Sequence, residues 1–75
     1  MRMKTEEELT QDAAIGYNIK LIRTRKQMSQ RQLAEAAGVS QTYMVMLESG
    51  TRTLSASLCK TLADLLEVSP EELLA

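Results

Sequence analysis

The side chains of this chain offer recognition chemistry rather than catalysis. Its 75 residues include no His, one Cys and three Gly. With no His, a single Cys and no Gly-rich phosphate loop, the chain offers no set of residues for acid–base or nucleophilic catalysis, so it is not expected to be an enzyme. One Cys without His can form neither an internal disulfide nor an ordinary zinc site. No metal, cofactor or small-molecule ligand is evident, and the polar side chains remain as candidates for binding a partner.

Gln41 is the clearest of these polar side chains. Its amide can hydrogen-bond bidentately to adenine N6 and N7, and the methyl groups of Thr42 and Val45 could contact a thymine methyl. Gln30 stands at the start of another predicted helix, where free backbone N–H groups favour an anion. Simple surface polarity is the alternative for Gln41. These side chains would suit contact with double-stranded DNA.

The charge distribution agrees with a phosphate-facing surface in the middle of the chain. The net charge is −1, yet residues 13–53 hold six Lys or Arg against two Glu, while residues 1–12 and 54–75 are both acidic. A basic middle between acidic ends is what a nucleic-acid-binding surface leaves in a sequence. An ordinary solvated charged face would give the same pattern, so that alternative stays open.

Two short helices joined by a tight turn must position the polar side chains. Ser29 and Gln32 form a capping box that starts a helix of about eight residues. Gly38 ends this helix by taking a positive φ, and Ser40 caps the next one within two residues. Two helices joined by so short a turn must cross steeply, which is helix-turn-helix geometry.

The second helix of this pair has distinct inner and outer faces. At about 100° per residue, Met44 and Leu47 point inward with Tyr43 at their edge. The residues on the outward face are Gln41, Thr42, Val45 and Met46.

Three further helices are expected around this pair. Ile15, Ile19 and Ile22 form one apolar stripe on a helix over residues 12–26. A helix over residues 55–66 includes Cys59, which is expected to be a small core residue. A capping box at residues 69–72 starts a last short helix. Residues 1–11 are expected to form a tail or a helical extension, and residues 12–75 the helix-turn-helix domain.

The stretch from Ile15 to Leu74 resembles the phage-repressor and Cro type of helix-turn-helix domain, often called Xre-like. The resemblance rests on I-x-x-I-R at 19–23, S-Q-x-x-L-A at 29–34, A-G-V-S-Q at 37–41, L-E-x-G at 47–50 and L-A-x-x-L-x-V at 62–68. It implies an all-α, compact five-helix lambda-repressor-like domain that binds operator DNA as a dimer. T-R-T-L-S at 51–55 and Thr42-Tyr43 are more similar to the controller proteins of restriction–modification systems, a subgroup of this family.

The resemblance also implies roles for individual positions. It gives Gln41, Thr42 and Met46 as base-facing residues, to which the exposed helix face adds Val45. The positions that match phosphate contacts are Ser29, Gln30, Ser40, Tyr43, Thr51 and Arg52. Arg23 and Glu48 match a partly buried ion pair that ties the first helix to the end of the third.

Val45 and Met46 depart from the family, which usually has a small polar and a long polar or basic residue there. Base reading at these positions would have to use van der Waals contact or DNA shape. Their apolar surface leaves a protein-interaction module, such as an antitoxin or a partner-binding regulator, as the alternative function.

A homodimer contact is expected around the last two helices, where the apolar residues exceed what one small core needs. These residues are Leu65, Val68, Leu73 and Leu74. Two-fold symmetry would place the two helices 41–49 in the major groove about one DNA turn apart, or a multiple of it, on a pseudo-palindromic operator. The predicted function is sequence-specific transcriptional regulation. The N-terminus carries three consecutive acidic residues where a signal peptide would be apolar, so a cytoplasmic protein without a membrane partner is expected.

Overall fold

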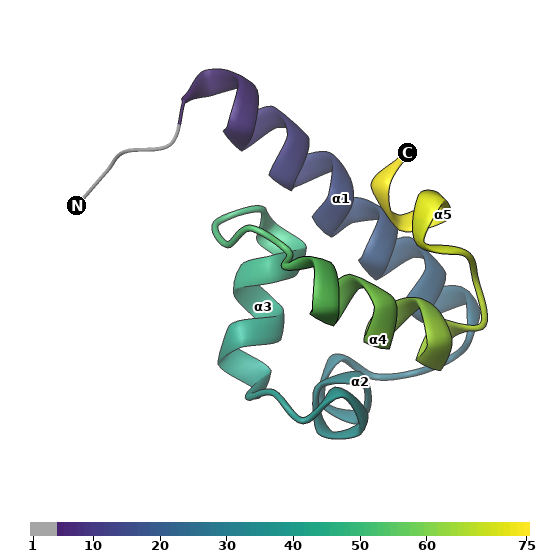
Figure 1. Ribbon diagram of the computed structural model, residues 1–75. Coiled ribbons are helices and arrows are strands. Elements are labelled where there is room, and N and C mark those ends of the chain that lie inside the picture. The colour runs from purple at the N-terminus through teal and green to yellow at the C-terminus, as the bar shows by residue number, and fades with distance from the viewer. Residues whose placement is uncertain (1–4) are drawn as a thin grey trace.

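The computed structural model describes residues 5–75, which contain five α-helices joined by short loops (Figure 1). They are α1 (Glu6–Arg25), α2 (Gln30–Ala37), α3 (Gln41–Ser49), α4 (Ala56–Leu66) and α5 (Pro70–Leu74). This part of the chain contains no strand, so the predicted all-α, five-helix class is confirmed. None of its helices is long and apolar enough to cross a membrane.

Every helix starts after a Ser or Thr. In four of them the side-chain oxygen of the cap accepts a backbone N–H three residues on, at 2.9 to 3.2 Å, namely at Thr5, Ser29, Ser40 and Ser55. The capping box at Ser29 is complete, because its N–H donates to Gln32 Oε1 at 2.7 Å. At α5, Pro70 takes the first helical position and the Ser69 N–H donates to Glu72 Oε2 at 2.8 Å. Local capping chemistry therefore sets where the helices begin.

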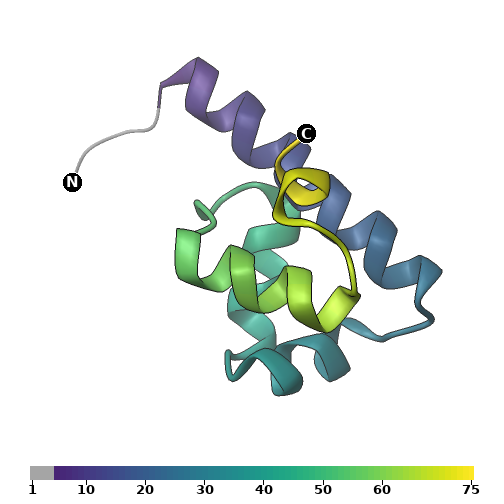
Figure 2. The ribbon, with the colours of Figure 1, turned by 45° about the vertical axis from the view of Figure 1, so that its right-hand side comes forward.

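α1 is longer than its apolar stripe predicts. The stripe indicates a start near Asp12, but the helix begins at Glu6, because Thr5 caps it and three Glu in the first turn favour the positive end of the helix dipole. Residues 6–11 are thus continuous with the rest of α1 and project past the other helices (Figures 1 and 2). Of the predicted N-terminal segment, residues 1–4 lie outside the described part of the chain.

The core lies where the helices converge. α1 and α2 both pack against α3, α4 packs against α2, and α5 packs against α1 and α4. The buried hydrophobic residues are Ile15, Ile19, Leu33, Ala34, Met44, Leu47, Cys59, Leu62, Ala63, Leu66 and Leu73. Cys59 is a core residue, as predicted, and burial raises the pKa of its thiol, with the Glu71 carboxylate raising this pKa further.

α1 crosses the end of α3 in direct backbone contact at Gly16. A Cβ added to Gly16 would overlap the carbonyl oxygens of Leu47 and Glu48. Gly50, which ends α3 with a φ of +82°, is equally confined, because a Cβ there would come within 2.7 Å of Ala13 Cα. The two glycines therefore set how closely α1 approaches the end of α3 and the loop that follows.

The residue set predicted for the dimer contact needs one correction, at Leu73. Its side chain has 0% exposure and belongs to the core of a single chain, so it has no surface to offer a second copy. The Asn18 amide also holds this end of the chain, donating to the carbonyls of Leu73 at 3.0 Å and Ala75 at 2.9 Å. Leu65 and Val68 are half-buried, and Leu74 is 51% exposed.

Candidate nucleic-acid interface

The turn between α2 and α3 has the predicted construction. Gly38 takes the left-handed conformation at φ +74° and ends α2. The Val39 N–H then donates to Ala34 O at 3.0 Å, and the Val39 side chain packs against the core. Ser40 starts α3 one residue later. The direction of α3 relative to α2 is therefore fixed by a short turn with its backbone groups bonded.

α3 buries one face and exposes the other. Met44 and Leu47 are 0% and 2% exposed, whereas Gln41, Thr42 and Val45 are exposed. Met46, expected on the outer face, is half-buried instead. The loop after α3 folds back on this turn of the helix, and its Thr51 N–H donates to the Met46 carbonyl at 3.0 Å. The outer face thus offers two polar side chains and one apolar one.

Glu48 accepts hydrogen bonds from two other helices. The expected ion pair with Arg23 is present and bidentate, with Nε to Oε2 at 2.7 Å and Nη2 to Oε1 at 3.0 Å. The third guanidinium nitrogen of Arg23 donates to Met28 O at 2.8 Å. Gln30 Nε2 adds a bond to Glu48 Oε1 at 3.1 Å. The two charged side chains are 12% and 5% exposed, so the network ties α1, α2 and α3 together in a mostly buried site.

The link from Gln30 to Glu48 was not predicted from sequence. Gln30 was interpreted as a phosphate contact at the start of α2, but one of its amide N–H groups is already used inside the protein. The second N–H and the amide oxygen remain for an outside partner. No sequence signal links two polar residues 18 positions apart, because their contact depends on how α2 packs on α3.

The loop after α3 is held at both ends. Arg52 and Thr51 donate their backbone N–H groups to Met46 O, and Thr53 Oγ1 donates to Asp12 Oδ2 at 2.9 Å. Asp12, only 6% exposed, anchors this loop to α1, which sequence reasoning missed. The Arg52 guanidinium lies 5.7 Å from the centre of the Tyr43 ring, a cation–π contact. Thr51 and Arg52 stay exposed beside α3.

Ser29 and Ser40 face the surface at the starts of the two helices. Each side-chain oxygen accepts a cap bond, from Gln32 N–H and from Tyr43 N–H, and each residue is exposed. Within residues 5–75 neither hydroxyl proton has an acceptor, so both can donate to an external anion.

The sequence around these helices matches a known family. A family model described as helix-turn-helix, HTH_3, aligns with residues 19–73, which include all of α2, α3 and α4. The chain belongs to this helix-turn-helix family. The Xre-like resemblance is thereby confirmed, and α2, the turn and α3 are its helix-turn-helix unit.

Solved structures of regulators share the fold of this helix-turn-helix protein. The restriction-modification controller protein C.AhdI from Aeromonas hydrophila is 31% identical with a TM-score of 0.81, over 85% of this chain and 97% of that one. The clp gene regulator ClgR from C. glutamicum is 32% identical with a TM-score of 0.79, over 84% and 82%. SinR, a master regulator for biofilm formation solved in complex with DNA, is 34% identical with a TM-score of 0.77, over 81% and 98%. A search of curated proteins found no match.

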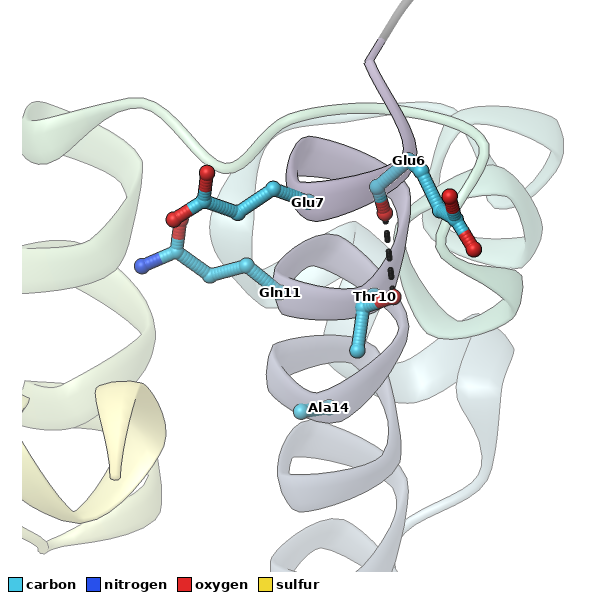
Figure 3. A pocket seen from close by; sticks show the side chains of 5 residues that line it. All are labelled: Glu6, Glu7, Thr10, Gln11 and Ala14. Carbon is cyan, nitrogen blue, oxygen red and sulfur yellow. Dashed lines mark hydrogen bonds between the residues drawn. The ribbon is translucent and has the colours of Figure 1, made fainter.

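The acidic end of α1 stands apart from the helix-turn-helix unit. A hollow of about 640 Å³ lies there, lined by α1 residues alone: Glu6, Glu7, Thr10, Gln11 and Ala14 (Figure 3). The Thr10 hydroxyl donates to the Glu6 carbonyl at 3.0 Å, inside the same helix. Two carboxylates with no cation among the lining residues repel an anion, so this hollow is a poor candidate for contact with a phosphate.

Proposed function

We propose that the protein is a transcriptional regulator that binds a specific double-stranded DNA sequence through α3. The observation that carries this proposal is the exposed outer face of α3, with Gln41, Thr42 and Val45 held in a fixed direction by the turn at one end and the Glu48 network at the other. An α-helix fits the major groove, where each base pair presents a distinct pattern of donors and acceptors. SinR, 34% identical, is solved in complex with DNA, and this supports DNA as the partner here.

Base reading would depend mainly on Gln41 and Thr42. The Gln41 amide suits a bidentate bond to adenine, and Thr42 and Val45 suit contact with thymine methyl groups. Half-buried Met46 can add only a small apolar contact at the edge. With so few polar side chains, part of the specificity would come from the shape and deformability of the DNA.

Backbone contacts would flank this reading face. The hydroxyls of Ser29 and Ser40 and the remaining amide groups of Gln30 lie at helix starts, where backbone N–H groups also favour an anion. The other candidates are Tyr43 on α3 and Thr51 and Arg52 in the loop after it, with the Arg52 guanidinium over the Tyr43 ring. Such contacts fix the position of α3 on the duplex without reading its sequence.

We also propose that the protein acts as a homodimer on a pseudo-palindromic operator. Leu65, Val68 and Leu74 are the partly exposed apolar residues of the last two helices. Leu74 also lines a groove of about 610 Å³, together with Leu54 and Pro70, that leaves apolar surface uncovered. Two-fold pairing of this surface would set the two α3 helices about 34 Å apart or a multiple of it. Control of a restriction–modification system is one form of this role, supported by the similarity to C.AhdI.

Selection from a random DNA library tests the proposed function. The protein is expected to enrich a pseudo-palindromic sequence. It should then bind that duplex with a saturable affinity that falls as salt rises and survives excess random competitor. Enrichment of no sequence after repeated rounds would contradict the proposal.

A protein-interaction module is the second candidate, favoured by Val45, which is 45% exposed in the middle of the outer face of α3. An apolar residue there suits a protein surface as well as a thymine methyl. The two functions separate in the same experiment, because a partner-binding module would select no DNA sequence and show only weak, salt-sensitive binding to any duplex.

A further inference from the structure

A small hollow lies where α1, α2 and α3 meet, at the edge of the outer face of α3. It has a volume of about 280 Å³ and is lined by Lys20, Arg23, Gln30, Val45, Glu48 and Ser49. At about 30 Å³ for each water of liquid density, it holds several waters or one hydrated anionic group. Exposed Val45 forms part of its wall, so the hollow, called here the Lys20 hollow, is continuous with the proposed DNA-reading surface.

The Lys20 hollow carries one uncommitted positive charge. Its only carboxylate, Glu48, already accepts two bonds from Arg23 and one from Gln30. Arg23 in turn donates through all three of its nitrogens, two to Glu48 and one to Met28 O, so it cannot turn outward without leaving a buried carboxylate unpaired. Lys20 is exposed, and its ammonium makes no hydrogen bond or ion pair with any residue from 5 to 75.

The position of Lys20 determines which part of the DNA its side chain can contact. It projects from α1, whereas the reading side chains stand on the outer face of α3. A side chain beside the reading helix meets the wall of the groove, which is sugar and phosphate, rather than the base edges. The lysine ammonium is a compact, hydrated charge on a flexible stem, which suits a phosphate oxygen.

We propose that the Lys20 hollow receives one backbone phosphate of the bound duplex and that the Lys20 ammonium contacts its oxygens. This inference rests on the proposed DNA-binding function. It adds a third helix, α1, to the two whose residues are expected to contact DNA. The contact is independent of sequence, because every phosphate is alike.

Lys20→Ala and Lys20→Arg test this proposal with the duplex selected by the unaltered protein. Arg25→Ala is the matched control, because Arg25 is an exposed cation on the same helix, α1, but does not line the Lys20 hollow. For Lys20→Ala, the slope of log affinity against log salt should fall in magnitude by about one, so the loss of affinity should be roughly threefold larger at 50 mM than at 200 mM salt. The loss should be equal on random duplex, Lys20→Arg should keep most of the affinity, and Arg25→Ala should leave the slope unchanged.

Duplexes with single phosphates neutralised as methylphosphonates then locate the contact. One neutralised position should weaken binding of the unaltered protein and leave Lys20→Ala unaffected. An unchanged salt slope in Lys20→Ala, a loss confined to the selected sequence, or additive effects at every neutralised position would each overturn the proposal while leaving DNA binding in place. Failure of the unaltered protein to select or bind DNA would instead reject the proposed function on which this inference rests.

Discussion

At the scale of single residues, Glu48 shows how an acidic side chain can lie beside a phosphate-binding surface. Its carboxylate is 5% exposed and accepts three hydrogen bonds from side chains of two other helices. Arg23 cancels its charge, so the repulsion that a free carboxylate would exert on DNA is removed. The same contacts orient Gln30, one of the residues proposed to meet a phosphate.

The first prediction concerns the stability of this network. Arg23→Ala leaves Glu48 buried with only Gln30 as a side-chain donor and removes the bond to Met28 O. Breaking a buried pair on one side is expected to destabilise the fold by about 3 kcal/mol. In a domain of this size, that corresponds to a fall in Tm of roughly 10 °C or more, measured by circular dichroism.

Arg25→Ala is the control for this measurement. Arg25 lies in the same last turn of α1, is exposed, and has no ion pair among residues 5–75. It should lower the Tm by only a small amount, since a cation near a helix C-terminus contributes less than about 1 kcal/mol. Equal Tm values for the two variants would show that the buried pair does not stabilise the fold.

The second prediction concerns base reading by Gln41. Gln41→Ala should leave the Tm unchanged, because the side chain is exposed, and should weaken binding to the selected duplex by roughly 30-fold, about 2 kcal/mol. The loss should disappear when the adenine read by Gln41 is replaced. Gln11→Ala, a change of the same type on an exposed residue of α1, should bind like the unaltered protein. A loss that is equal on every duplex would make Gln41 a backbone contact.

At the scale of elements, sequence reasoning succeeds where the signal is local. The caps at Ser29 and Ser40, the stop at Gly38 and the two faces of α3 each depend on residues within one or two turns. Contacts between distant segments were not visible in this way. The bond that Thr53, in the loop after α3, donates to Asp12 forms only when α1 and that loop pack together. The half-burial of Met46 also went unpredicted.

The ion pair was anticipated only through the family resemblance, because nothing in the sequence itself joins Arg23 to Glu48. The helical start at Glu6 agrees with one of the two alternatives for residues 1–11, a helical extension, which the apolar stripe alone did not favour over a tail. Apolar periodicity marks only the buried length of a helix, and the first turns of α1 project beyond the other helices (Figure 2).

The third prediction concerns the crossing of α1 and α3. At an exposed helix position, Gly to Ala stabilises a protein by up to about 1 kcal/mol. At Gly16 the new methyl group would overlap backbone carbonyls of α3 that have no rotamer to adopt, so Gly16→Ala is expected to destabilise the fold by about 2 kcal/mol. Urea unfolding measures whether Gly16→Ala lowers or raises the free energy of unfolding. A higher free energy of unfolding in the variant would mean that α1 can move away from α3 at no cost.

At the scale of the whole molecule, charge and apolar surface are separated. Lys20 on α1 and Arg52 in the loop after α3 are exposed beside the helix-turn-helix unit. The exposed charges at the start of α1 are acidic, and α5 carries Glu71 and Glu72. A net charge of −1 therefore coexists with a locally positive face. Such an arrangement orients a molecule as it approaches DNA, because its acidic ends are repelled while its middle is attracted.

The last prediction concerns the oligomer. A single core in 75 residues is small, and Leu74 leaves half of its surface exposed beside the groove of α4 and α5. Leu74→Lys should weaken self-association, measured by sedimentation equilibrium, and make binding to the two half-sites independent, while the Tm extrapolated to low concentration stays the same. Leu73→Ala should instead lower the free energy of unfolding of the single chain by about 3 kcal/mol, because Leu73 is fully buried.

Tyr17→Ser is the matched control for the dimer, because Tyr17 is 62% exposed but lies on α1, outside the proposed contact. It should leave both self-association and the steepness of DNA binding unchanged. If Tyr17→Ser dissociates the dimer and Leu74→Lys does not, the contact lies on α1. A two-fold axis through α1 would set a different distance between the two α3 helices. The selected operator would then show a different separation of its half-sites.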